Sequence, residues 1–280
     1  MATLLQNQYG KHRVRVMKVH RKESLHEVME LEGDVLLSGD LAASYLSDDN
    51  QSIVPTDTVK NTIHVLAHDH LGQCRTAFSQ VIGEHFLTRY SHLSGVSVEL
   101  RERRWKHLPV QGVPHPHAFA PEANGTWFAR SNFQRDAAPI RRAGLRDHLL
   151  MKTTESAFVD YNVCEFTTLP PAEDRILATR LTAEWTFAEG ANEVGAVDGI
   201  FLEAAHEVLA TTFSPSVQRT LFQLGELFLE RAAEVSQVEL RMPNVHFLGL
   251  DLSALGRPDQ NQVFLPTDEP HGEIEAVVGR

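Results

Sequence analysis

The chain has few cysteines, no long apolar run and no excess of basic residues, and each of these absences narrows what it can be. Among its 280 residues only Cys74 and Cys164 are cysteines, too few for a disulfide framework or a four-cysteine zinc site. No stretch approaches the roughly 20 apolar residues of a membrane-spanning helix. The formal net charge of −11 provides no basic face for nucleic acid or an anionic membrane. We therefore expect a cytoplasmic protein that binds neither nucleic acid nor membrane.

Common cofactor and metal motifs are also missing. The sequence contains no GxGxxG, GxxxxGK[ST], GxSxG or paired-cysteine redox motif, so no nucleotide cofactor is indicated. His64 and His68 lie one helical turn apart, but neither a following glutamate nor a nearby cysteine completes a zinc motif. No metal site is expected. The role of the histidines at 64–70 and 115–117 stays open.

Hydrophobic periodicity in the first half of the chain changes in a regular order. Alternating apolar residues predict strands, and apolar residues three or four apart predict helices. The expected elements are strands at 11–21 and 26–41, helices from about 57 to 71 and at 74–93, and strands at 95–105 and 125–133.

The second half repeats this order. The expected elements are strands at 148–159 and 175–187, helices at 199–213 and 216–235, and a returning strand at 236–252. A glycine-rich connection at 188–199 precedes the first of these helices, and its conformation is not predicted.

Two short identities support a duplication. TVKNT in the first half parallels SVQRT in the second, and VELR occurs once in each half at the strand that follows the helix pair. We therefore predict an α+β protein made of two ββααββ repeats. The first domain would span residues 1–140, and the second, with a C-terminal extension, residues 141–280.

Helix starts and one arginine are the first candidate binding positions. Thr56 and Gln218 stand where loops enter helices, and free amides at a helix start can bind an anion. Thr56 and Ser216 could instead simply cap their helices, which is the more common role. Arg175 opens a strand and could hold a flat anion, or else pair with neighbouring Glu173 or Asp174.

The stretch RMPNVHFLGLDLS reads as a strand with a breaker near its start. Pro243 removes one amide from the hydrogen-bond ladder. Asn244 and His246 follow it two residues apart, so on an extended chain both would share one face. An amide and an imidazole at a strand irregularity favour a functional role for this pair.

Taken together, these stretches resemble a known family. YGKHRVRV, IVPTDTVKNT, DRIL, SVQRT and MPNVHF, in this order along nearly the whole chain, resemble motifs of the urate oxidase (uricase) family. PTDEPHGEIEA is similar to the C-terminal region of its bacterial members. The resemblance implies two tandem tunnelling-fold (T-fold) domains, with antiparallel sheets and helices on one face. It also implies a homotetramer around a barrel-like tunnel, with active sites shared between subunits.

The resemblance further implies roles for single residues. Proton handling would fall to Lys11, Thr56 and His246. Substrate contacts would come from Phe158 stacking on the purine, Arg175 and Gln218 gripping its edge, the backbones of Val217 and Asp57, and Asn244 beside dioxygen. An aromatic face, a guanidinium fork and a carboxamide match a flat, anionic purine.

The implied reaction is the cofactor-independent oxidation of urate by O2 to 5-hydroxyisourate and hydrogen peroxide, a step of purine degradation. Two alternatives stay open. One is a zinc-dependent, pterin-type enzyme of the same fold, with several of the 15 histidines as ligands. The other is a purine-binding protein without catalytic activity.

Overall fold

The computed structural model describes residues 2–192, 194–257 and 261–280. The chain folds into two compact units. The first comprises Met1–Gly144 with Trp185–Ala196, and the second Leu145–Glu184 with Val197–Arg280. The boundary predicted near residue 140 lies within a strand that continues from the first unit into the second. Within the described ranges, no helix has the length and apolar character needed to cross a membrane.

The first unit is built on an antiparallel sheet whose strands lie in the order β1, β2, β3 and β6. These strands are β1 (Tyr9–His20), β2 (Glu27–Gly39), β3 (Leu93–Arg103) and β6 (Thr126–Gln134). Alternate residues of β2 are buried along most of its length, as the period of two requires. The four strands predicted in this half are confirmed to within a few residues.

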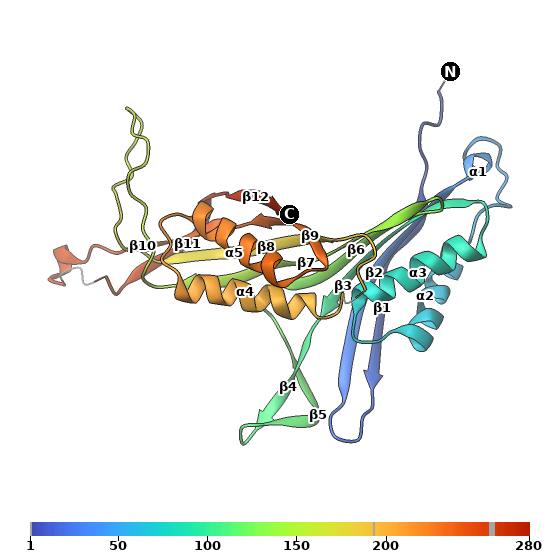
Figure 1. Cartoon of the computed structure of the whole chain (residues 1–280), viewed down its shortest axis with the longest axis horizontal. Helices are drawn as coiled ribbons and strands as arrows, with labels where there is room; N and C mark the ends of the chain where they lie inside the picture. Colours follow the sequence, from blue (N-terminus) through green and yellow to red (C-terminus); the bar gives the residue numbers. More distant parts are fainter. Residues whose placement is uncertain (1, 193, 258–260) are drawn as a thin grey trace. The chain divides into compact units, whose positions relative to one another are not determined.

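Helices α2 (Thr56–His70) and α3 (Arg75–Arg89) pack on one face of this sheet (Figure 1). Their apolar side chains, among them Ile63 and Phe86, form a core with buried sheet residues such as Val35. Both helices were predicted from the sequence. The short helix α1 (Ala42–Leu46) was not.

A separate two-stranded sheet, β4 (Trp105–Val110) and β5 (Val113–Pro121), was also missed. The turn between these strands contains Gln111 at φ 53° and Gly112 at φ 82°. Positive φ at both central residues is typical of a type I′ hairpin turn. Gly112 was thus the local signal, but three prolines obscured the alternation around it.

The second unit combines antiparallel strands with two helices. In chain order its elements are β7 (Ala137–Lys152) and β8 (Leu177–Phe187), both shared with the first unit, α4 (Val197–Thr211), α5 (Val217–Arg231), β9 (Val235–Arg241), β10 (Asn244–Gly249), the 3-10 helix η1 (Ser253–Leu255), β11 (Phe264–Gly272) and β12 (Glu275–Gly279). Strand β8 pairs with β9 and β10, β11 pairs with β10, and β12 pairs with β9. Helix α5 packs on α4 and on β9 and β12.

Three predictions for this half need correction. The strand predicted at 148–159 ends at Lys152, where the chain bends, and Glu155 takes a left-handed φ of 59°. The strand predicted at 236–252 is two strands, separated at Met242 and Pro243. Strands β11 and β12 were not predicted. In the glycine-rich connection 188–199, Glu193 lies outside the described residues.

Helix α5 offers a matched test of the second core. Phe228 is fully buried, and its ring meets Phe201 edge-on with the centroids 5.1 Å apart. Phe222, on the same helix, is 46% exposed. We expect Phe228→Ala to lower the free energy of unfolding by about 3 to 5 kcal/mol through lost burial and a residual cavity. Phe222→Ala should cost less than about 1 kcal/mol. Urea unfolding measures both, and equal losses would contradict this packing.

Candidate active site

In the first unit, β1 and α2 lie side by side and run in the same direction. At the start of this pair, the Tyr9 hydroxyl accepts a hydrogen bond from the Val54 amide at 2.7 Å. Near the other end, the Lys18 ammonium donates to the carbonyl of His68 at 2.7 Å. Lys11, two residues after Tyr9, therefore lies beside the first turn of α2.

The charge of Lys11 acts on this first turn. A hydrogen bond from the Lys60 ammonium is the main cause that lowers the pKa of the exposed Asp57 carboxyl. A hydrogen bond from Asn61 and the positive charge of Lys11 act in the same direction. The first unit thus brings Lys11 near Asp57, which follows Thr56 directly in the chain.

Thr56 is the first residue of α2 rather than its cap. The N-cap position belongs to Pro55, and no side chain caps this helix. The capping role considered for Thr56 is therefore wrong, because a proline holds the position from which a cap side chain would act. The same expectation is confirmed for Ser216, whose hydroxyl accepts the Arg219 amide at 3.2 Å at the start of α5.

In the second unit, backbone hydrogen bonds bring Phe158 and Arg175 together. The Phe158 amide donates to the Ala172 carbonyl at 2.7 Å, and the Arg175 amide donates to the Ser156 carbonyl at 2.8 Å. The guanidinium carbon of Arg175 lies 5.3 Å from the centroid of the Phe158 ring. A half-buried cation and a half-buried aromatic ring thus lie in contact with each other.

Arg175 is a partly desolvated cation, and no described residue supplies it with a counter-charge. Burial lowers the pKa of its guanidinium, and no other group contributes. Within the described residues its Nε is buried without a hydrogen-bond partner. The ion pair considered with Glu173 or Asp174 is not formed, and the Asp174 carboxylate accepts the Thr154 hydroxyl at 2.9 Å. Such a cation can bind an anion at little further desolvation cost.

The start of α5 lies close to Phe158, because the segment before the helix is hydrogen-bonded to the residue before Phe158. The Ala157 amide donates to the Ser214 carbonyl at 2.8 Å, just before Phe158. Ser214 precedes the helix by three residues, so the first helical residues, Val217 and Gln218, follow closely. Val217 is buried and Gln218 is exposed, which leaves the Gln218 carboxamide accessible.

Strand β10 starts beside β8, the strand that follows Arg175. Asn244 pairs with Thr179 of β8 on one side and with Gly272 of β11 on the other. Because β8 and β10 are antiparallel, His246 lies toward the beginning of β8, on the Arg175 side. The pairing with β11 shifts register between Asn244 and His246. The expected strand irregularity at this point is confirmed.

One aromatic residue of this site was missed. The ring of Tyr161 stacks on Phe158, with centroids 4.9 Å apart and planes 15° from parallel. The only sequence signal was its separation of three residues in a loop, which carries little weight. Tyr161 thereby covers one face of the Phe158 ring, and the Arg175 guanidinium also lies over this ring.

The histidines considered as metal ligands have other contacts. His64 Nε2 lies 3.3 Å from the Arg15 carbonyl oxygen, and His68 Nδ1 lies 2.6 Å from the Asp69 carboxylate. In the part of the chain that the structure describes, no three His, Cys, Asp or Glu side chains are grouped so as to hold a metal ion.

Comparisons with known proteins agree on one family. The sequence model of the uricase family matches residues 7–127 and 141–275. The uricase of Cyberlindnera jadinii is 38% identical, over 99% of this chain and 97% of its own length. That of Oryctolagus cuniculus is 34% identical, over 97% and 93%. The crystal structure of uricase from Arthrobacter globiformis has a TM-score of 0.93 at 30% identity, covering 100% of this chain and 96% of that one.

This chain belongs to the uricase family. Its antiparallel sheets with few helices agree with the solved uricase structure. Within this uricase-family chain, Lys11, Thr56 and Asp57 belong to the first unit. The other positions implied by the resemblance belong to the second unit: Phe158, Arg175, Val217, Gln218, Asn244 and His246.

The unpaired guanidinium of Arg175 leads to a stability prediction. In the absence of ligand, Arg175→Met should leave the free energy of unfolding unchanged or raise it by up to about 1 kcal/mol, because removing an unpaired, half-buried charge outweighs a lost cation–π contact. Arg231→Met, which breaks an exposed pair with Glu207, should lower it slightly. Denaturant unfolding compares the two. A marked fall for Arg175→Met would mean that the guanidinium has a stabilising partner.

Proposed function

We propose that this member of the uricase family oxidises urate with O2 and needs neither a metal nor an organic cofactor to do so. In balanced form, urate, O2 and water give 5-hydroxyisourate and hydrogen peroxide. The observation that carries the proposal is the desolvated Arg175 guanidinium beside the Phe158 ring. A planar anion can stack on the ring and supply the charge that Arg175 lacks.

We assign substrate binding to residues of the second unit. Arg175 and Gln218 hold the edge of the purine, Phe158 stacks on its face, and the amide of Val217 offers a backbone contact. Gln218 is exposed in the first turn of α5, where unpaired amides and the helix dipole also favour negative charge. Planarity and charge together select an anionic purine over neutral or bulky ligands.

We assign proton removal to Lys11 with Thr56, next to a contact from the backbone of Asp57. An amine serves as a base where burial or a nearby cation disfavours its ammonium form, and a hydroxyl can relay the proton. The placement of Lys11 beside the first turn of α2 supports this pairing. Loss of the proton makes the bound purine electron-rich.

We assign the oxygen steps to Asn244 and His246. The dianion passes an electron to O2 held beside Asn244, and the radical pair combines to a peroxide adduct on the purine. Hydrogen peroxide leaves, and water adds at the same carbon to give 5-hydroxyisourate. His246 can move the protons, since imidazole changes charge near neutral pH. The break at Pro243, which starts β10 anew at Asn244, supports a special role for this pair.

We infer that a complete site needs two protomers. The proposed proton-handling lysine and threonine belong to the first unit, and the proposed substrate grip belongs to the second. The resemblance to T-fold uricases supports a homotetramer around a tunnel, in which the first unit of one protomer completes the second unit of its neighbour. The oligomeric state in solution, measured by sedimentation, tests this assembly.

The function itself is tested with urate in air and under nitrogen, using protein treated with a chelator and analysed for metals. We expect urate absorbance to fall only in air, with one O2 consumed and one hydrogen peroxide formed per urate. Stoichiometric zinc that is required for turnover would favour the pterin-type alternative. Urate binding without oxygen uptake would favour the non-catalytic alternative.

Lys11 has a matched control on its own strand. Lys11→Met should lower kcat on the order of 100-fold, and Thr56→Ala should also lower it, because each removes an acid–base group. Lys18→Met removes a lysine that bonds carbonyls at the end of α2, so its turnover should stay close to wild type. Steady-state urate kinetics measure all three. Wild-type rates in Lys11→Met would remove Lys11 from the mechanism.

A further inference from the structure

Strand β1 contains a bulge immediately after Lys11. Lys11 pairs with Val35 of β2, and Val14 pairs with Gly33, so His12 and Arg13 both stand opposite Asp34. Two residues facing one define a β-bulge. Arg13 takes a φ of 57°, a left-handed conformation that is unfavourable for a residue with a side chain.

The bulge decides which face of the sheet carries Lys11. Paired residues of adjacent strands point to the same face, and Val35 is buried in the core beneath the helices. Lys11 therefore points to the helix side, as Val14 does. In a regular strand, residues three apart point to opposite faces. Without the extra residue, Lys11 would point away from α2 when Val14 is in the core.

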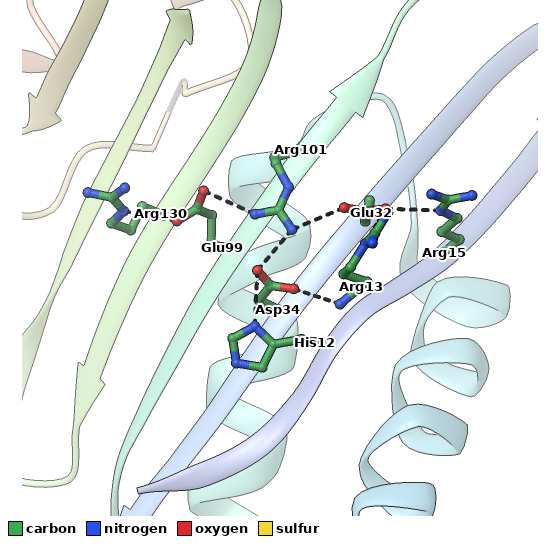
Figure 2. A network of polar contacts seen from close by, with 8 residues as sticks. All are labelled: His12, Arg13, Arg15, Glu32, Asp34, Glu99, Arg101 and Arg130. Carbon is green, nitrogen blue, oxygen red and sulfur yellow. Dashed lines mark hydrogen bonds and ion pairs between the residues drawn. The ribbon is translucent and has the colours of Figure 1, made fainter.

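The Asp34 carboxylate holds the bulge together (Figure 2). One oxygen accepts the Arg13 backbone amide at 2.6 Å, and the other accepts the Arg101 guanidinium at 2.8 Å. His12 Nδ1 lies 3.4 Å from it. Burial acts to raise the pKa of Asp34, but the bonds from the Arg13 amide and Arg101 lower it overall. The carboxylate is thus ionised at neutral pH and accepts the amide that the bulge takes out of the ladder.

We propose that Asp34 is a positioning residue for the reaction, which keeps Lys11 on the helix side of the sheet by accepting the Arg13 amide. Arg101 in turn fixes the direction of the carboxylate. The proposal rests on the proposed function in one respect, namely that Lys11 must reach the substrate. Asp34 itself touches neither substrate nor Lys11.

The second unit contains a residue in the same backbone conformation with a neutral acceptor. Asp147 of β7 has a φ of 58°, and its amide donates to the hydroxyl of Thr182 in β8 at 3.1 Å. Residues 11–18 (KHRVRVMK) align with 145–152 (LRDHLLMK), so Asp147 corresponds to Arg13. A neutral oxygen is therefore sufficient to accept the amide of a strand residue in this conformation.

The alignment extends to the residue that the bulge presents. Leu145 occupies the position of Lys11 and is fully buried. Lys152 occupies the position of Lys18, and each of these two lysines donates to a carbonyl at the end of a helix, that of Thr212 in the second unit. The position that the bulge turns toward the helices in the first unit is thus occupied by a buried leucine in the second. In the first unit that residue is the lysine that the reaction uses.

The test compares three variants in urate kinetics. Asp34→Ala should lower kcat by at least about tenfold with little change in KM, because a misplaced base slows chemistry and the substrate grip lies elsewhere. Asp34→Asn keeps an acceptor oxygen and should stay within about threefold of wild type. Glu32→Ala is the matched control. Glu32 lies on the same strand and also bonds Arg101, but it bonds no amide of the bulge. Its kcat should stay near wild type.

A second readout does not depend on activity. Amide hydrogen exchange at residues 11–14, followed by mass spectrometry, should speed up in Asp34→Ala and stay slow in Asp34→Asn and Glu32→Ala. If Asp34→Ala does not fold, Asp34→Val, which suits a strand, takes its place. Slow amide exchange or a wild-type kcat in a variant that lacks the Asp34 acceptor oxygen would overturn the proposal. A fall of kcat in Glu32→Ala or Asp34→Asn as large as that in Asp34→Ala would also overturn it. If the wild-type protein does not oxidise urate, the proposed function is wrong. Amide hydrogen exchange at residues 11–14 still tests whether Asp34 holds the bulge.

Discussion

Side chains alternate between the two faces of a β-strand, and the position of Lys11 depends on one local exception to this rule. A single extra residue in β1 turns Lys11 toward the helices, and the Asp34 carboxylate accepts the amide that is displaced. The hydrogen bond from the Val54 amide to the Tyr9 hydroxyl ties the segment that leads into α2 to β1, two residues before the lysine. The geometry of the proposed proton-handling residues depends on these contacts, and none of them involves a ligand.

The substrate contacts proposed for the second unit depend on a charge that no described residue balances. Arg101 in the first unit lies within hydrogen-bond distance of three carboxylates, those of Glu32, Asp34 and Glu99. Arg175 is desolvated beside Phe158 and has no such partner within the described residues. A desolvated cation without a counter-charge costs stability, and such a cost is common where a ligand supplies the missing charge. The neighbouring carboxylate of Asp174 is held by Thr154, which keeps it from neutralising the site.

The two units share some local features and differ in others. Both contain a strand residue with positive φ at corresponding positions, Arg13 and Asp147, and a lysine that bonds the end of a helix. They differ two residues before it, where the first unit has Lys11 and the second has the buried Leu145. They also differ at their helix starts, where Ser216 caps α5 but Pro55 leaves α2 without a side-chain cap. Corresponding positions of the two units thus carry different chemical groups on a similar backbone.

The sequence by itself determined the order of the main strands and helices, the break at Pro243, the cap at Ser216 and the family, because hydrophobic period, proline and short motifs are local signals. It failed at the β4–β5 hairpin, where prolines masked the alternation, and at β11 and β12, which depend on partners distant in the chain. Only the tertiary structure showed that Thr56 is not a cap and that no described carboxylate pairs with Arg175. It also showed that Tyr161 stacks on Phe158 and that Lys11 points to the face of the sheet on which the helices pack. Apart from Thr56, which follows the proline at the N-cap, those features depend on the opposite strand, on burial or on contacts within a folded loop. A one-residue change of register leaves no trace in the local pattern.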